Sequence, residues 1–192
     1  MPKAFIKYPD GSRCSGEEDY IAMLYYKHVN DLFTWGLTYT HQREVIKDCI
    51  QDLFVWLLNN RNKLKDIQNV QVYLFTSFRN NLKRLLQERK SGNGSDIELN
   101  DAFASKLMDH SSNVLEKLEN NEVSYSRRRQ VRQILRELSG RQKRIIYLKY
   151  YLEMDYDEIC EVLSLNYQSA RTLIYRSIRK MRQVYRDIRL VE

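Results

Sequence analysis

The feature of this sequence that most constrains its fold is the near absence of helix-breaking residues. Both prolines, Pro2 and Pro9, precede residue 10, and only 6 glycines occur among the 192 residues. Proline lacks the backbone donor of a helical turn, and glycine loses the most conformational entropy when a helix forms. Long uninterrupted helices are therefore possible along most of the chain, and we expect an all-α protein.

The clearest local pattern lies near the C-terminus, where two helical segments flank a short turn. Acidic residues follow Asp155, where they suit the positive end of a helix. Ser164 and Asn166 favour a turn, and we expect Ser169 to cap the second helix. In that helix the apolar residues are spaced by four, four and three, so that they share one face: Ala170, Ile174, Ile178 and Met181.

This pattern predicts a helix-turn-helix, a motif whose second helix can lie in the major groove of DNA. Acidic residues are almost absent between residues 166 and 186, and basic and polar side chains fall away from the apolar stripe. The start of the helix, where base edges are usually contacted, carries Tyr167, Gln168, Ser169 and Arg171. The alternative is a pair of ordinary amphipathic helices with a solvated basic face.

Charge is distributed unevenly along the chain, which has a net charge of +7 and a pI near 9.2. Residues 1–90 have a net charge of +4, residues 91–124 of −5, and residues 125–192 of +8. The basic balance suits a polyanionic partner such as nucleic acid. We interpret the acidic segment as a boundary between two basic parts of the chain.

The sequence therefore predicts two small helical domains, residues 20–90 and 127–192, joined by an acidic flexible linker at residues 91–126. An N-terminal lead of residues 1–19 precedes them, and the C-terminal domain contains the helix-turn-helix. Apolar spacing predicts the other helices from Tyr20 onward, at residues 44–58, 70–90, 127–138 and 141–152.

Residues 59–69 form a polar linker with four asparagines, which suits turns. The helix that follows interleaves aromatic residues with Arg and Lys, as a surface that grips unstacked bases and phosphates would need. The alternative is a helix packed in the protein interior whose basic residues are only solvated. In the helix before the linker, the polar residues Asp48, Gln51 and Asp52 are most simply explained as solvent-facing positions.

No set of residues with catalytic or metal-binding spacing is recognisable in the sequence. Cys14, Cys49 and Cys160 are odd in number and widely spaced, which is typical of reduced thiols in a cytoplasmic protein. His28 and His41 lack the partner spacing of metal ligands. We find no phosphate-binding glycine-rich loop, no signal peptide and no apolar run near 18 residues. We therefore expect a protein that is not an enzyme, has no cofactor and does not insert into a membrane.

Several segments carry motifs that are informative together. Residues 48–54 read Asp, two residues, Gln, two residues and Phe, and Val72-Tyr73-Leu74 is followed by Arg79-Asn80. The C-terminal part adds residues 138–145, 156–161, 176–177 and 181–182. Taken together, these segments resemble a bacterial RNA polymerase sigma factor of the extracytoplasmic-function (ECF) group: its Asp-Gln-Phe pattern, its promoter-melting helix and its promoter-reading lobe, in that order. The sequence of residues 166–171 is similar to that of Bacteroidetes-type members.

The resemblance implies a protein that binds core RNA polymerase, promoter DNA and an anti-sigma factor. The residues implied in polymerase binding are Asp48, Gln51, Asp52 and Phe54. Those implied at the −10 element are Asn59, Asn60, Arg61, Asn62, Lys63, Arg79, Asn80 and Lys83. Those implied at the −35 element are Tyr167, Gln168, Ser169, Arg171, Thr172, Tyr175, Arg176 and Arg179.

The sequence departs from the family's pattern at a few positions, which puts individual contacts in question rather than the fold. Arg84 stands where the melting helix usually has Asp, and Lys47 where Glu is usual. In the last helix, Ala170 replaces the common Val and Ile178 the common Arg. A stand-alone helix-turn-helix regulator that binds operator DNA remains the alternative, although it does not explain residues 48–54.

Overall fold

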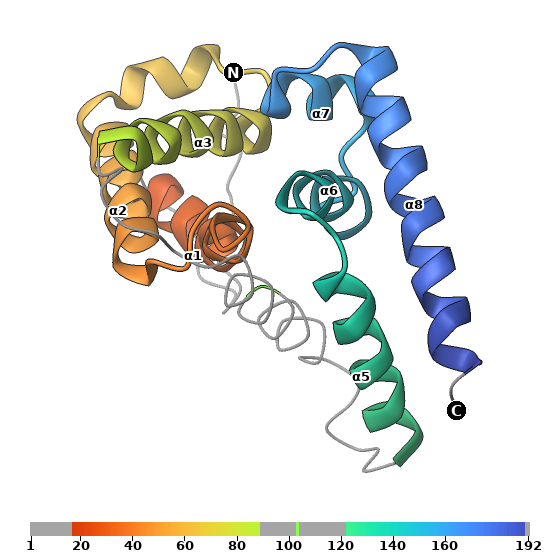
Figure 1. Ribbon diagram of the computed structural model, residues 1–192. Coiled ribbons are helices and arrows are strands. Elements are labelled where there is room, and N and C mark those ends of the chain that lie inside the picture. Colours follow the sequence, from red (N-terminus) through yellow and green to blue (C-terminus); the bar gives the residue numbers. More distant parts are fainter. Residues whose placement is uncertain (1–16, 89–102, 104–121, 191–192) are drawn as a thin grey trace.

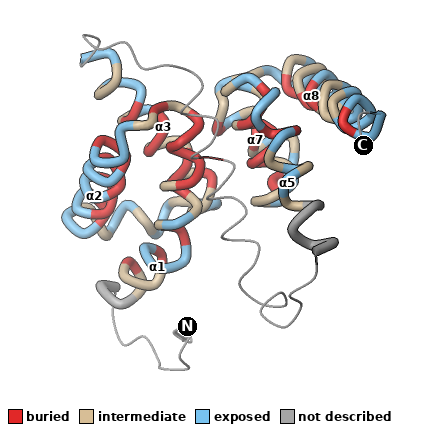
Figure 2. Tube along the Cα trace, turned by 60° about the horizontal axis from the view of Figure 1, so that its bottom comes forward, coloured by how far each residue is buried: buried red, intermediate tan, exposed pale blue. Residues whose placement is uncertain are grey.

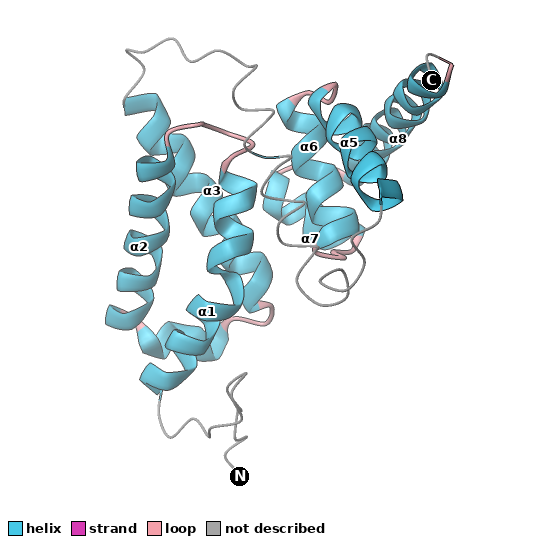
Figure 3. Ribbon diagram, turned by 90° about the horizontal axis from the view of Figure 1, so that it is seen from below, coloured by secondary structure: helices cyan, strands magenta, loops and turns pink. Residues whose placement is uncertain are grey.

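The computed structural model describes residues 17–88, 103 and 122–190, and every regular element in these residues is a helix (Figure 3). The N-terminal domain consists of α1 (Glu17–Gly36), α2 (Arg43–Asn59), the 3-10 helix η1 (Arg61–Asp66) and α3 (Val70–Glu88). The C-terminal domain consists of α5 (Glu122–Arg136), α6 (Gly140–Ile146), the π-helical turn η3 (Tyr147–Tyr151), α7 (Tyr156–Leu163) and α8 (Tyr167–Arg189). The predicted all-α class with two helical domains is confirmed.

The predicted lead and linker lie largely outside the described residues. α5 begins at Glu122 rather than at residue 127, so a helix starts inside the segment expected to be linker. Phe103, the described residue of that segment between α3 and α5, is 1% exposed, and its ring centroid lies 6.0 Å from that of Tyr147. At this position the segment is therefore packed against the C-terminal domain.

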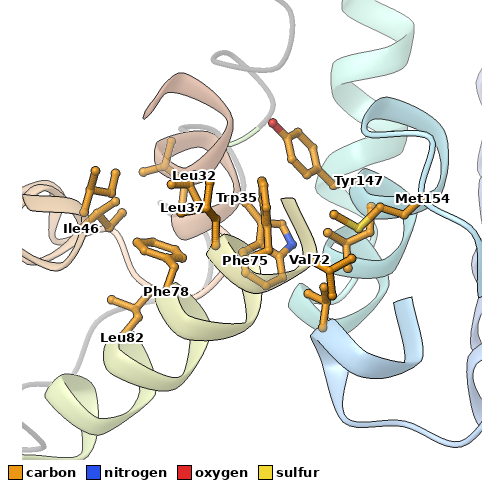
Figure 4. Packing of buried hydrophobic residues seen from close by; sticks show 14 of the residues in the cluster. Leu32, Trp35, Leu37, Ile46, Val72, Phe75, Phe78, Leu82, Tyr147 and Met154 are labelled. Carbon is orange, nitrogen blue, oxygen red and sulfur yellow. The ribbon is translucent and has the colours of Figure 1, made fainter. Parts of the chain in front are cut away.

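Aromatic side chains fill the interior of the N-terminal domain (Figure 4). Trp35 is fully buried, and its ring centroid lies 5.2 Å from that of Phe75 and 6.2 Å from that of Phe78. Next to it, Gly36 allows α1 to approach α2 closely, because a Cβ there would lie 2.8 Å from Cγ2 of Ile46. The three long helices α1, α2 and α3 thus enclose one closely packed interior.

Side-chain caps define the helices of the C-terminal domain. Ser139 forms a capping box at the start of α6, and Asp155 forms another at the start of α7. The prediction for α8 was wrong by three residues, because Asn166 is its N-cap and accepts from the backbone N–H of Ser169 at 2.7 Å. The predicted turn is confirmed at Ser164, which has a φ of 52° and lies in the left-handed region.

The helix expected over residues 141–152 is not uniform. It is α-helical through Ile146 and then widens into η3, where the N–H of Leu152 donates to the carbonyl of Tyr147 at 3.0 Å. The chain leaves this turn through Glu153, whose φ is 56°, and Lys149 Nζ closes it by donating to the carbonyl of Met154 at 3.1 Å. Apolar spacing could not reveal this widening, because one extra residue in a single turn hardly changes the pattern.

The polar segment 59–69, expected to be a linker, contains the short helix η1. The side chains at its two ends hold it in place. Asn60 Nδ2 donates to the carbonyl of Trp56 at 2.9 Å, and Asn69 Oδ1 accepts from the N–H of Val72 at 3.1 Å. These bonds satisfy backbone groups at the end of α2 and the start of α3, so the asparagines here act largely as helix caps.

The two domains pack against each other. The first part of α3 lies beside α7 (Figure 1), and one cluster of buried apolar side chains includes residues from both domains, among them Val72 and Met154. Polar contacts reinforce this packing, because Arg144 Nη1 donates to the Thr38 carbonyl at 2.9 Å and its guanidinium lies 4.2 Å from the centre of the Tyr39 ring. Figure 2 shows that α2 and α8 nevertheless keep long exposed faces.

At Gly140 the backbone of the C-terminal domain closely approaches that of the N-terminal domain. A Cβ at this position would lie 3.1 Å from the carbonyl oxygen of Thr38, which already accepts from Arg144.

No helix in the described part of the chain is long and apolar enough to cross a bilayer.

We expect the substitution Gly140→Ala to loosen the contact between the domains by about 1–3 kcal/mol, the range usual for an extra methyl group in a packed site. Small-angle X-ray scattering should show a larger radius of gyration. Glu137→Ala, at an exposed position near the same end of α6, serves as the control. An unchanged radius for Gly140→Ala would show that the Thr38 loop yields without separating the domains.

Candidate functional site

The outer face of α8 is polar and basic. Ala170 and Ile174 are buried against the rest of the C-terminal domain, and this orientation turns the opposite face of α8 to solvent. Tyr167 is 51% exposed and Tyr175 is 66% exposed. The other predicted residues of this face are also accessible: Gln168, Arg171, Arg176 and Arg179 are exposed, and Ser169 and Thr172 are half-buried.

The start of α8 is held in a defined position relative to α7. Asn166 caps the helix, and the ring centroid of Tyr167 lies 5.2 Å from that of Tyr156 on α7. The positive dipole end of α8 lies close to Arg171, which is exposed. This arrangement can approach a polyanion end-on and present side chains to it, as the second helix of a helix-turn-helix does in the DNA major groove.

A second surface lies on α2, where polar residues recur at helical spacing. Asp48, Gln51 and Asp52 are exposed and share one face with Val55, which is 47% exposed. Phe54 does not belong to this surface. It is 5% exposed, and its ring packs edge-on against Tyr25 with centroids 5.1 Å apart. Phe54 therefore supports α2 from within the domain, and only the three polar residues of the predicted set are available to a partner.

A groove of about 430 Å³ lies between α2 and α3. It brings together Asp52, from the predicted polymerase set, and Asn80, from the predicted −10 set, with two aromatic residues, Trp56 and Tyr73. The remaining lining residues are Leu53, Ser77, Asn81 and Arg84. The groove therefore combines amide, cationic and aromatic groups, the types that hold single-stranded nucleic acid.

Sequence reasoning did not single out Trp56 or Tyr73 as site residues. Trp56 is 38% exposed, its ring centroid lies 6.3 Å from that of Tyr73, and Lys63 Nζ lies 5.2 Å from its ring centre. Lys63 is far enough along the chain that only the fold of η1 brings it over the ring. The broad apolar content of α2 was the available signal, because a helix with too many apolar residues for one face must expose some of them.

The predicted −10 residues at the end of α2 and in η1 fall into two groups. Asn59, Asn62 and Lys63 are exposed, whereas Asn60 and Arg61 are half-buried. Asn60 donates to the carbonyl of Trp56, and Arg61 Nε donates to the carbonyl of Leu58 at 2.8 Å. Asn60 and Arg61 therefore also bond to the backbone at the end of α2.

The structure separates Arg79 from the other predicted residues of α3. Asn80 and Lys83 are exposed, but Arg79 is only 7% exposed. Its Nη1 donates to the carbonyl of Val162 at 2.7 Å and to the hydroxyl of Ser164 at 2.9 Å, both in the C-terminal domain. In this arrangement of the domains the guanidinium cannot reach DNA.

Within the described residues there is no group of three or more His, Cys, Asp or Glu side chains that could hold a metal ion. Cys49 and Cys160 are free, and burial raises the pKa of the Cys49 thiol to about 12. A thiol with so high a pKa is a poor nucleophile. His28 is 3% exposed, and burial, assisted by the charge of Lys27, lowers its pKa to about 4. Cys49 and His28 thus behave as parts of the packed interior.

Comparisons with known proteins agree with this geometry. Residues 128–181 match the family described as Sigma-70, region 4. Over 159 residues the chain is 22% identical to the RNA polymerase sigma factor YlaC of Bacillus subtilis (strain 168), which covers 83% of this chain and 88% of that protein. A chain in the co-crystal structure of the sigma factor RpoE with the anti-sigma factor NepR from Bartonella quintana has a similar fold, with a TM-score of 0.56 and 12% identity, over 87% of this chain and 97% of that chain.

The matched region 4 covers the helix-turn-helix and most of the exposed basic face of α8. The similarity to a curated sigma factor extends over the N-terminal domain as well, since it spans most of both chains. Together these findings show that the chain contains a Sigma-70 region 4 domain and is similar to an RNA polymerase sigma factor over most of its length.

Proposed function

We propose that this protein binds core RNA polymerase, directs it to promoters and helps to open the DNA for the start of transcription. The observation that carries the proposal is the exposed basic face of α8, which lies within the region 4 match and is oriented by the cap at Asn166. Promoter DNA and core polymerase are its partners, and it acts as a binding subunit without chemistry of its own.

The −35 element is proposed to bind along α8. Guanidinium groups of Arg171, Arg176 and Arg179 are exposed on one side of the helix. Arginine can donate two hydrogen bonds to the major-groove edge of guanine, which makes it the commonest specific contact to a base pair. Tyr167, Gln168, Ser169, Thr172 and Tyr175 complete the proposed surface.

The −10 element is proposed to bind at the groove between α2 and α3 and at η1. A base removed from the stack loses a few kcal/mol of stacking and pairing, and an aromatic surface such as that of Trp56 can replace part of the stacking. Asn80 lines this groove, and Lys63 Nζ lies over the ring of Trp56, another of its lining residues. Asn59 and Asn62 are exposed in the adjoining segment, where Asn60 and Arg61 donate to carbonyls in the last turn of α2. Arg79 can join only if the two domains separate.

Core polymerase is proposed to bind the exposed face of α2. Asp48, Gln51 and Asp52 offer acceptors and negative charge, and Val55 offers apolar area beside them. An anti-sigma factor is a further proposed partner, and the cytoplasm, where the polymerase works, is the proposed location. A stand-alone helix-turn-helix regulator is the second candidate, since the face of α8 alone would suit operator DNA.

Transcription by purified bacterial core polymerase on a genomic promoter library tests the proposal directly. We expect specific transcripts that appear only when the protein is added, and their upstream sequences should share −35 and −10 elements. Tight operator binding by the protein alone, with no new transcripts and no association with polymerase, would favour the stand-alone regulator.

We expect the double substitution Asp48→Ala and Gln51→Ala to weaken binding to core polymerase by about tenfold, the loss usual for well-placed interface residues. The melting temperature should stay the same, because both side chains are exposed. Glu161→Ala, at an exposed acidic position on α7, controls for the loss of charge. A variant that binds polymerase normally would remove this face from the interface.

We expect Arg176→Ala to weaken recognition of the −35 element by about 1–3 kcal/mol if the guanidinium makes two bonds to one base. The effect should be confined to the base pair that it contacts, which competition binding with a set of −35 variants can show. Arg182→Ala, at an exposed position farther along α8, provides the matched control. An equal loss of affinity for every −35 variant would show that Arg176 contacts a backbone phosphate and not a base.

A further inference from the structure

A cavity of about 240 Å³ lies between the two domains. α3 contributes Arg79 and Lys83, and α6 contributes Arg141 and Arg144. The other lining residues are Tyr39, Leu163 and Leu165. Four cationic side chains, two from each domain, therefore surround a space that no carboxylate among the described residues lines.

The described surroundings do not neutralise these charges. Arg79 is paired with the neutral carbonyl and hydroxyl of Val162 and Ser164, and Arg144 with the carbonyl of Thr38. Tyr39 could supply a negative charge only as phenolate, but burial raises its pKa to about 12 despite the nearby guanidinium groups. At neutral pH the cavity wall thus carries positive charge that hydrogen bonds to neutral acceptors leave uncompensated.

The pKa values of the lining groups show the same imbalance. Partial burial, followed by the charges of Arg79 and Arg144, lowers the pKa of Lys83. Burial also lowers the pKa of Arg144, to which the charges of Arg141 and Arg79 add, while Tyr39 acts in the opposite direction. Like charges gathered in a partly desolvated space repel one another, and an anion placed among them removes that repulsion.

The size of the cavity and the geometry of its donors limit the kind of anion. The space equals roughly eight water molecules at about 30 Å³ each, less than the 300–1,000 Å³ usual for a whole drug-sized ligand. Guanidinium groups present planar pairs of N–H donors that match phosphate oxygens, and an ammonium group adds a compact charge. Arg79 is more than nine-tenths buried, so one donor is already fixed in place.

We propose that this cavity binds a small phosphate-bearing anion, of the size of inorganic phosphate or diphosphate, which joins the two domains. The anion contacts both α3 and α6, so its binding favours the packed arrangement over a separated one. Binding itself does not depend on the proposed sigma-factor function. The consequence of anion binding does depend on that function. An anion held by Arg79 and Lys83 competes with promoter DNA for the same side chains, and DNA in turn competes with the anion.

Calorimetric titration of the purified full-length protein with inorganic phosphate and with diphosphate tests the proposal, with chloride used to match ionic strength. We expect saturable binding with one site per chain. The double variant Lys83→Gln and Arg141→Gln removes one cation from each domain, and both side chains are exposed, so the fold should persist. Binding should weaken roughly tenfold or more, because charge-assisted contacts are lost from both sides.

Arg182→Gln, an exposed cation on α8 outside the cavity, is the matched control and should bind like the unchanged protein. Equal weakening in the control, or none in the double variant, would overturn the proposal. Titration with a short DNA duplex separates a second source of phosphate: binding of DNA but of neither small anion would assign these cations to DNA backbone contacts. Because no polymerase is present, failure here is distinct from failure of the proposed function.

Scattering measurements test the link between the two domains. Diphosphate should reduce the radius of gyration of Gly140→Ala toward that of the unchanged protein, and it should have no such effect when Lys83→Gln and Arg141→Gln are also present. An anion that binds without changing the radius of Gly140→Ala would show that it does not join the domains.

Discussion

The buried guanidinium of Arg79 links the two domains through hydrogen bonds, in addition to their shared apolar packing. It crosses from α3 to the C-terminal end of α7, where the Val162 carbonyl accepts at 2.7 Å and the Ser164 hydroxyl at 2.9 Å. A buried charge is costly to desolvate, and carbonyls at the end of a helix compensate it with partial negative charge. The left-handed backbone at Ser164 directs its hydroxyl to the same place, so the helix-turn-helix itself forms half of this site.

This contact divides the surfaces of the protein by their accessibility. The basic face of α8 and the polar face of α2 are exposed to solvent, whereas the C-terminal domain covers part of the surface of α3. A protein packed in this way can present the proposed −35 face of α8 and the proposed polymerase face of α2, but its domains must separate before Arg79 can reach DNA. The energy for that separation must come from partners that bind only the separated form.

Much of the architecture could be predicted from the sequence, because the responsible interactions act within one or two helical turns. The stripe from Ala170 to Met181 was predicted correctly, and so was the turn at Ser164. The cap of α8 was misassigned to Ser169, since Asn166 and Ser169 both have capping side chains and differ by one turn. Phe54 was grouped with Asp48 and Gln51 by the family's pattern, but its position on the helix faces the interior.

The sequence by itself determined the helical class, the order of the helices, the helix-turn-helix and the outward basic face of α8. These follow from apolar spacing, capping residues and charge, which need no distant partner. Only the tertiary structure decided that Arg79 is buried and that four cations from two domains surround one cavity. The physical reason is distance along the chain: the acceptor of Arg79 lies 83 residues away, and no local pattern encodes which distant carbonyl a side chain will meet.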